Sequence, residues 1–245
     1  AVHINAFNFP VWGMLEKLAP TLLAGMPAIV KPATASGYVA EAAVRIMLES
    51  GILPDGALQL VSGDLGDLLD RLDGQDVVSF TGSAATALTL RSNPNLLSGA
   101  VRFVAEQDSL NATILGPDAM PGTPEFDLFL KEAHREMTAK AGQKCTAIRR
   151  IIVPEAMMDP VAEAISARLA ATRIGDPRVE TTRMGALVGQ AQKADVEAQL
   201  VAFAGEVQPV FTGEGLTIEA DNPEAGAFLK PSLYRCADPD AATRV

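Results

Sequence analysis

The chain has 245 residues, 48% of them hydrophobic and 20% charged, with a net charge of −10 at pH 7. This length suffices for one or two domains with a real core, and the acidic balance argues against a nucleic-acid partner, because phosphate contacts need a basic face. Two cysteines and two histidines, far apart in sequence, do not make a disulfide scaffold and argue against a zinc site. With no signal peptide and no apolar run of bilayer length, we expect a cytoplasmic protein without a membrane or metal partner.

Both ends of the chain resemble interior positions of a longer sequence. The chain begins without Met in the strand-like "AVHIN" and stops at "AATRV" with no terminating element. We expect a segment of a longer polypeptide, and an ordinary processed terminus is the alternative.

The first hundred residues alternate short β-rich runs with helical stretches. Strands are predicted at "AIVK" (28–31), "ALQLV" (57–61), "DVVSF" (76–80) and "AVRFVAE" (100–106), and helices at 38–49, at 65–72 and after "FTGS". Strands that alternate with helices pair in parallel, so the pattern predicts α/β architecture with a doubly wound parallel sheet.

The pattern changes beyond residues 106–111, where we place a domain boundary. Strands are predicted at "ATILG" (112–116), 147–154 and 207–211, and helices at 124–141, 157–171 and 190–204. The predicted domains are therefore 1–106 and 107–245, with a second α/β lobe after the first.

The segment "AGQKCTAIRR" (141–150) places a cysteine among polar and small residues ahead of a strand. Cations favour the thiolate that makes a cysteine nucleophilic, and Lys144, Arg149 and Arg150 lie close in sequence. We therefore interpret Cys145 as a candidate nucleophile, with a buried structural cysteine as the alternative. Cys236, in "LYRCAD", has no such surroundings and is predicted to be structural.

A cysteine nucleophile needs a proton acceptor, and neither histidine is a strong candidate. His3 lies in the opening strand, and we expect His134 on the solvated face of a helix. Glu106 ends an apolar strand at the lobe boundary, where partial desolvation would raise its pKa. The alternative is a solvent-facing glutamate at a strand end.

Three strand-to-helix connections carry further candidates. Thr81, Gly82 and Ser83 of "FTGS" could present backbone N–H groups to a phosphate, although such turns are common as simple connections. Lys31 of "VKPATAS" could reach an adenine ribose or its phosphate. The amide of Asn8, in "NAFNFPVWG", is a candidate oxyanion donor.

Taken together and in this order, "NAFNFP", "VKPA", "FTGS", the glutamate and "GQKC" resemble the aldehyde dehydrogenase family. "AGQKCTAIRR", "EKLAP" and "DSLNA" are most similar to the dehydrogenase half of the bifunctional ring-opening enzymes of bacterial phenylacetate catabolism. The semialdehyde dehydrogenases of the benzoyl-CoA pathway share most of these motifs. The resemblance implies a Rossmann-like cofactor domain followed by a catalytic domain.

The resemblance also implies a role for each matched residue. Cys145 corresponds to the nucleophile, Asn8 and the Cys145 backbone N–H to the oxyanion donors, and Glu106 to the general base. Glu16 and Lys17 correspond to a buried acid–lysine pair that relays protons, with a helix-surface salt bridge as the alternative.

The resemblance implies a nicotinamide cofactor and suggests which one. Lys31 corresponds to the residue that contacts the adenine ribose, and NAD-preferring members commonly carry glutamate three residues later. Here that position is Thr34, and a hydroxyl, unlike a carboxylate, does not repel a 2′-phosphate. We therefore predict NADP, with Ser83 near the pyrophosphate.

Two departures from the family pattern stand out. Gln107 follows the glutamate where relatives usually have a small residue, and the chain ends before the family's later motif for the nicotinamide ribose. The leading hypothesis is an NADP-dependent dehydrogenase of an open-chain CoA-linked semialdehyde from phenylacetate breakdown, homo-oligomeric in its intact form. The alternatives are the benzoyl-CoA pathway enzyme, a thioester-forming acyltransferase and a non-catalytic nucleotide-binding fragment.

Overall fold

The computed structural model describes residues 1–236 and 238–242. The chain divides into two compact units, Ala1–Asp108 and Ser109–Val245, and the division falls where the sequence pattern changes. Within the described residues, no helix combines the length and the apolar character needed to cross a membrane.

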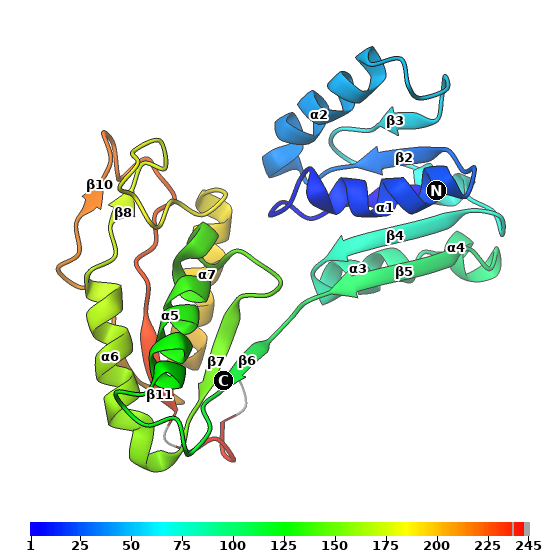
Figure 1. Cartoon of the computed structure of the whole chain (residues 1–245). Coiled ribbons are helices and arrows are strands. Elements are labelled where there is room, and N and C mark those ends of the chain that lie inside the picture. The colour runs from blue at the N-terminus through cyan, green and yellow to red at the C-terminus, as the bar shows by residue number, and fades with distance from the viewer. Residues whose placement is uncertain (237, 243–245) are drawn as a thin grey trace. The chain divides into compact units, whose positions relative to one another are not determined.

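The first unit is a five-stranded, fully parallel sheet with the strand order β3-β2-β1-β4-β5 (Figure 1). Its strands are β1 (Val2–Ile4), β2 (Ala28–Lys31), β3 (Leu58–Leu60), β4 (Val77–Gly82) and β5 (Arg102–Gln107). Its helices are α1 (Trp12–Leu23), α2 (Gly37–Glu49), α3 (Ala84–Arg91) and α4 (Pro94–Ser98), with short 3₁₀ turns η1 (Thr34–Ser36) and η2 (Leu68–Arg71). The predicted doubly wound sheet is confirmed.

Helices cover both faces of this sheet. On one face, α1 and α2 pack over Ala28, Val30 and Leu58 in one buried cluster. On the other face, α3, α4 and η2 contribute to a second cluster that contains Val2 and Phe80. Side chains alternate along each strand, so successive residues of β1 and β4 face opposite helix layers.

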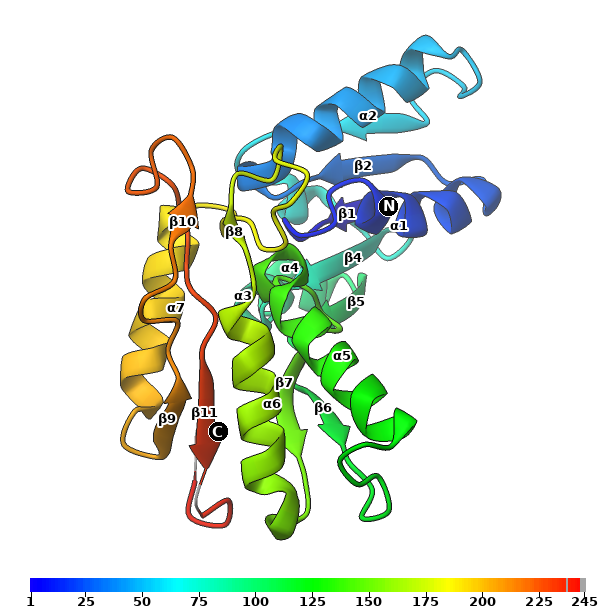
Figure 2. The same ribbon diagram turned by 60° about the vertical axis from the view of Figure 1, so that its left-hand side comes forward.

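The second unit packs two helices against short paired strands (Figure 2). Its helices are α5 (Pro124–Thr138), α6 (Met158–Ala170) and α7 (Gln190–Phe203), with 3₁₀ turns η3 (Ala139–Gly142) and η4 (Glu155–Met157). Its strands are β6 (Asn111–Ile114), β7 (Ile148–Ile152), β8 (Ile174–Gly175), β9 (Val207–Phe211), β10 (Ile218–Glu219) and β11 (Leu233–Cys236). β6 pairs with β7 and β8 with β10 in parallel, whereas β9 and β11 are antiparallel. The apolar sides of α5 and α6 meet in one core, around Leu130 and Ile165.

Two elements of the first unit differ from the sequence prediction. The helix expected at 65–72 is only the 3₁₀ turn η2, because Gly66 adopts a left-handed φ of 55° just before it. The short helix α4 was not predicted, although Asn93 and Pro94 carry a helix-start signal. Asn93 accepts hydrogen bonds from the backbone N–H groups of Asn95 and Leu96, and Pro94 occupies the first turn.

In the second unit, the helix predicted to reach residue 141 ends at Thr138. Lys140 and Ala141 have φ values of 54° and 52°, which no right-handed helix accommodates. The expectation of a solvated His134 on this helix is also wrong. Its ring is half-buried, with Nε2 2.8 Å from Thr172 Oγ1, and burial together with the charge of Arg168 lowers its pKa.

Candidate functional site

The carboxyl edge of the first sheet holds most of the residues singled out by the sequence. The chain runs outward from β1 through β2 to β3, then returns to β4 beside β1, so the winding direction reverses between β1 and β4. In open α/β sheets, ligands bind outside the carboxyl ends of the strands at such a reversal. The loops that follow β1 and β4 therefore mark this edge as a ligand site.

Asn8 lies half-buried in the loop between β1 and α1. The Gly13 backbone N–H donates to the Phe9 carbonyl at 2.8 Å, and the rings of Phe9 and Trp12 meet edge to face at 5.5 Å. Pro10 lies inside the turn that leads into the helix. The "NFP" segment thus forms a tight turn before a helix, as predicted, and its role as an oxyanion donor stays a prediction.

The predicted phosphate turn at "FTGS" is only partly a turn. Thr81 and Gly82 belong to β4, where they pair with Glu106 and Gln107 of β5, so they do not lie at the helix N-terminus as expected. Gly82 is needed there because a Cβ would lie 2.5 Å from the Phe80 ring. Ser83 alone begins α3, and its Oγ accepts the Thr86 N–H at 3.2 Å.

A shallow groove of about 290 Å³ in the first unit brings four predicted residues together. Glu16, Lys17, Thr81 and Glu106 line it, along with Phe80. Two of these residues come from α1, and the others come from β4 and β5, which follow 63 to 90 residues later in the sequence. The groove therefore places the Glu106 carboxylate of β5 on the same surface as the lysine–glutamate pair of α1, and a proton relay between them stays a prediction.

The Glu16–Lys17 pair has features of both predicted alternatives, a buried acid–lysine pair and a helix-surface salt bridge. The Lys17 Nζ lies 3.5 Å from Glu16 Oε1 and donates to the Gly13 carbonyl at 3.1 Å. The Lys17 side chain is only 10% exposed, whereas that of Glu16 is 38% exposed. The lysine is thus buried, while its acid partner opens to solvent.

The expected desolvation of Glu106 is not observed. β5 forms an edge of the five-stranded sheet, and Glu106 is exposed there, as are Val104 and Gln107. The structure therefore matches the solvent-facing alternative for the carboxyl group. Its role as the general base stays a prediction.

Several buried polar atoms near the carboxyl edge have no hydrogen-bond partner among the described residues. They belong to Asn5, Ser36 and Thr81. Ile4 pairs with Phe80, so Asn5 and Thr81 follow it at the ends of neighbouring strands. Buried polar groups are normally hydrogen-bonded, so these atoms are positioned to bond to ordered water or to a ligand at this edge.

Lys31 and Thr34 lie at the same edge. Lys31 is half-buried at the end of β2, and Thr34 is exposed in the turn that precedes α2. An ammonium and a hydroxyl are thus offered at this edge without an intervening carboxylate in "KPAT", and the cofactor that they select stays a prediction.

Cys145 lies in the second unit, on the turn that precedes β7. Its side chain is exposed, which contradicts the alternative of a buried structural cysteine. Three successive residues ahead of it, Lys140, Ala141 and Gly142, have left-handed φ values of 54°, 52° and 71°. Non-glycine residues in this region are uncommon and cluster at functional sites.

The cations near Cys145 differ from the expectation. Lys144 is ion-paired with Glu136 at 2.7 Å, with both side chains largely buried and not aligned for a hydrogen bond. Its charge is therefore compensated by the Glu136 carboxylate. Arg149 donates to the Gly142 carbonyl at 2.9 Å, and burial lowers its pKa.

The residues that hold this turn are not among those predicted from the sequence. Ser109 and Asn111 both donate to the Cys145 carbonyl, and Gln143 links its own segment to Val188. "DSLNA" entered only as a similarity to relatives. The sequence feature that could have predicted them is the pair of short polar residues just ahead of a strand, because such side chains commonly bond to nearby backbone groups.

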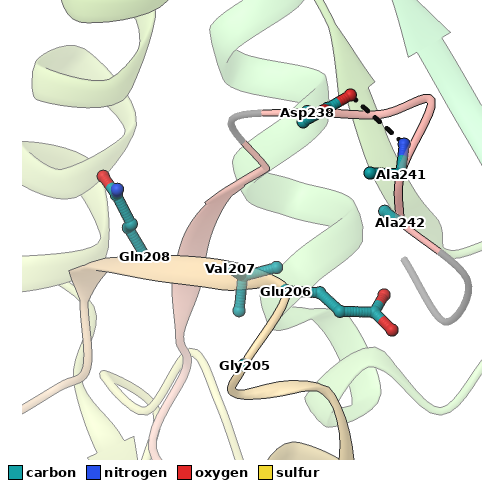
Figure 3. A pocket seen from close by; sticks show the side chains of 7 residues that line it. All are labelled: Gly205, Glu206, Val207, Gln208, Asp238, Ala241 and Ala242. Atoms are coloured by element: carbon teal, nitrogen blue, oxygen red, sulfur yellow. Dashed lines mark hydrogen bonds between the residues drawn. The ribbon is translucent and has the colours of Figure 1, made fainter.

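A second hollow, of about 300 Å³, lies between the start of β9 and the C-terminal segment (Figure 3). Glu206 and Asp238 are its charged lining residues, and the Asp238 carboxylate accepts the Ala241 N–H at 3.2 Å. No residue singled out by the sequence lines it. The hollow is therefore not part of the candidate site.

Comparison with known proteins agrees with the motif pattern. Residues 1–243 match the model of the aldehyde dehydrogenase family. A 3,4-dehydroadipyl-CoA semialdehyde dehydrogenase of Aromatoleum evansii is 50% identical over 246 residues, covering 100% of this chain and 48% of the relative. An aminoacetaldehyde dehydrogenase of Pseudomonas aeruginosa is 31% identical over 239 residues, covering 95% of this chain and 45% of the relative. The chain thus spans about half the length of these relatives.

Solved structures show the same fold. Succinic semialdehyde dehydrogenase from Streptococcus pyogenes, in complex with NADP+, superposes with a TM-score of 0.85 at 22% identity, over 98% of this chain and 50% of that one. Betaine aldehyde dehydrogenase from Staphylococcus aureus, in complex with NAD+, superposes with a TM-score of 0.83 at 24% identity, over 95% of this chain and 45% of that one. Because one holds NADP+ and the other NAD+, the fold alone does not select the cofactor. The family match nevertheless covers nearly the whole sequence, and this chain belongs to the aldehyde dehydrogenase family.

Proposed function

We propose that this chain carries the cofactor-binding and nucleophile-bearing parts of an NADP-dependent dehydrogenase of CoA-linked semialdehydes in aromatic catabolism. The observation that supports this best is the groove in the first unit. It gathers Glu106, Lys17 and Glu16, each assigned a role by the family motifs, at the edge of one sheet. Domains 1–106 and 107–245 would then bind the cofactor and carry the nucleophile.

The proposed reaction begins at Cys145. Its thiolate attacks the aldehyde carbon, and the carbonyl oxygen becomes an oxyanion, for which the family resemblance assigns the Asn8 amide and the Cys145 backbone N–H as donors. NADP, when bound, accepts the hydride that leaves this adduct, and a thioester remains on Cys145. Aldehyde, NADP⁺ and water thus yield acid, NADPH and one proton.

Glu106 completes the cycle by activating water. Its carboxylate takes a proton as water attacks the thioester, and the acid leaves with regeneration of the thiol. Lys17 and Glu16, which line the same groove, can carry that proton to solvent because Glu16 is the more exposed of the two. A water-activating base favours hydrolysis over acyl transfer to free CoA.

Cofactor choice rests on Lys31 and Thr34. The ammonium attracts a 2′-phosphate, and the hydroxyl at position 34 neither repels it nor competes with it for Lys31. Ser83, at the start of α3, lies at the edge where the pyrophosphate is expected, next to Thr81 and Gly82 at the end of β4. These assignments favour NADP over NAD.

Two substrates are proposed. The leading one is the open-chain CoA semialdehyde formed in phenylacetate breakdown, because the motifs are most similar to those of that pathway's enzymes. The second is 3,4-dehydroadipyl-CoA semialdehyde, after which the relative with 50% identity is named. On the same resemblance, we propose that the intact enzyme is a cytoplasmic homo-oligomer.

The test is NADPH absorbance on mixing the protein with NADP and each CoA semialdehyde, with a short free aldehyde as the control. A faster rate with one CoA substrate identifies the pathway. Turnover of the free aldehyde alone would retain the dehydrogenase and reject the pathway. No turnover of any substrate, with Cys145 unreactive toward alkylation, would indicate a non-catalytic nucleotide-binding protein instead.

A further inference from the structure

The carbonyl group of Cys145 is held by two side chains from the other strand segment of its sheet. The Ser109 hydroxyl and the Asn111 Nδ2 both donate to this oxygen. A carbonyl oxygen has two lone pairs, and here both are used. The peptide plane that follows Cys145 is therefore fixed from outside its own turn.

Asn111 also holds the far end of that turn. Its Nδ2 donates a second time, to the Ala147 carbonyl at 3.1 Å, while the Ala147 N–H donates to the Lys144 carbonyl at 3.2 Å. An amide nitrogen has two hydrogens, and both partners are carbonyls, so the orientation of the amide is fixed. One carboxamide thus spans the whole turn that carries the thiol.

The ladder between β6 and β7 is irregular at this position. Asn111 pairs with Ile148, but the next residue, Ala112, pairs with Arg150, so β7 carries one extra residue there. Bulges of this kind redirect side chains and are common beside active sites. Asn111 lies at the irregular end of this ladder, and its side chain contacts the turn that precedes β7.

The segment ahead of Cys145 is anchored separately. Gln143 Nε2 donates to the Lys140 carbonyl at 2.9 Å, and Gln143 Oε1 accepts the Val188 N–H at 2.9 Å. The left-handed residues Lys140 and Ala141 lie just before this anchor. Strained backbone persists only where its surroundings hold it, and these contacts supply that support.

The backbone N–H of Cys145, in the peptide group that precedes the residue, is left available. Within the residues that the structure describes, the Cys145 backbone N–H donates to no acceptor, whereas its carbonyl accepts twice. The Lys144 carbonyl, in the same peptide plane as the Cys145 N–H, accepts the Ala147 N–H at 3.2 Å. With the peptide planes on both sides of Cys145 held, the directions of its N–H and of the Cα–Cβ bond that carries the exposed thiol are fixed. In the proposed mechanism the thiol attacks the aldehyde carbon and the N–H donates to the aldehyde oxygen.

We infer that Asn111, assisted by Ser109, is a positioning residue that aims the Cys145 thiol and N–H at the aldehyde. The inference rests on the proposed role of Cys145 as the nucleophile. Asn111 touches neither substrate nor cofactor in this assignment; it acts through the backbone of the turn. Small misplacements of a reacting group reduce rates strongly, by about 10²-fold for roughly 1 Å.

The experiment compares the wild type with Asn111→Ala in the full-length enzyme, using kcat, KM and the pH dependence of Cys145 alkylation by iodoacetamide. We expect kcat to fall by about 10²-fold, with little change in KM. The pH midpoint of alkylation should stay unchanged, because no charge near the sulfur is altered. A merely structural role would instead lower the melting temperature and leave the kcat of the folded fraction intact, and that result would overturn the inference.

A matched control and a second variant complete the test. Asn222→Ala removes another backbone-bonding asparagine of the same unit, whose Oδ1 accepts the Ala225 N–H at 3.2 Å, and should leave kcat unchanged. If the Asn111→Ala variant does not fold, the kcat of the Ser109→Ala variant tests the inference instead. It should lower kcat by about fivefold, with recovery in Ser109→Thr, and wild-type kinetics in Ser109→Ala would overturn the inference. Wild-type turnover in Cys145→Ser would instead reject the proposed function itself.

Discussion

The two units present their candidate groups in different ways. The first unit uses regular topology, since parallel strands deliver Asn5, Thr81 and Glu106 to one sheet edge and α1 brings Lys17 beside them. The second unit presents Cys145 on an irregular turn held by side-chain contacts to its backbone. Regular topology fixes where a group lies, whereas an irregular turn also fixes where a single thiol points.

The largest expected effect lies in the second unit. Cys145→Ala removes the nucleophile, so NADPH formation should fall by roughly 10⁴-fold or more. NADP binding should stay nearly unchanged, because the cofactor residues belong to the first unit. Stopped-flow absorbance and cofactor titration measure the two quantities, and a comparable loss of cofactor binding would contradict the assignment.

The next effect tests the groove of the first unit. Glu106→Gln removes the water-activating base but leaves Cys145, so one turnover should occur before the enzyme stalls as a thioester. Steady-state rates should fall by about 10²- to 10⁴-fold. Mass spectrometry of the quenched reaction should find the acyl adduct on Cys145. Steady-state turnover at the wild-type rate, without an acyl adduct on Cys145, would show that another group activates water.

The third effect concerns the stability of the first unit. Burial, together with the charge of Lys17, lowers the pKa of His3 from 6.5 to about 4. Its neutral form is therefore favoured by folding, so its contribution is complete above pH 6.5 and is lost as the pH falls toward 4. The loss is at most about 3 kcal/mol.

Fluorescence of Trp12, the single tryptophan, during urea unfolding can measure this loss in the same unit. Stability that stays constant from pH 6.5 to 4 would contradict the prediction, and His3→Gln should flatten the slope. The low pKa of Asp176, about 2 because of its hydrogen bonds to Arg178, acts only below pH 3.8 and does not interfere.

The smallest effect is a change of cofactor preference. Thr34→Glu places a carboxylate where a 2′-phosphate is proposed, and should shift the NADP/NAD ratio of kcat/KM toward NAD by about tenfold. Thr34→Ser keeps the hydroxyl and serves as the control. An unchanged ratio in the glutamate variant would place the adenine ribose elsewhere.

The sequence predicted the regular parts of the candidate site well. The strand β2 agrees with its prediction to the residue, and Ser83 lies at the start of α3 as expected. Alternating strands and helices fix a parallel sheet, and the carboxyl ends of parallel strands share one edge. Glu106 was correctly placed at a strand end, but its exposure depends on β5 being an edge strand of the described sheet.

The irregular parts were beyond the sequence pattern. Lys140 and Ala141 are ordinary helix formers, and only tertiary contacts such as that between Gln143 and Val188 explain a helix that ends at Thr138. The same holds for Asn111, whose two donors meet carbonyls more than thirty residues away.

By itself, the sequence determined the family, the parallel sheet and the identity of the exposed cysteine, because these depend on local periodicity and on motif order. Only the tertiary structure decided the conformation of the turn that carries Cys145, the pairing of Lys144 with Glu136 and the groove shared by Lys17 and Glu106. Each of these depends on contacts across an irregular turn or between distant segments, which local residue patterns do not encode.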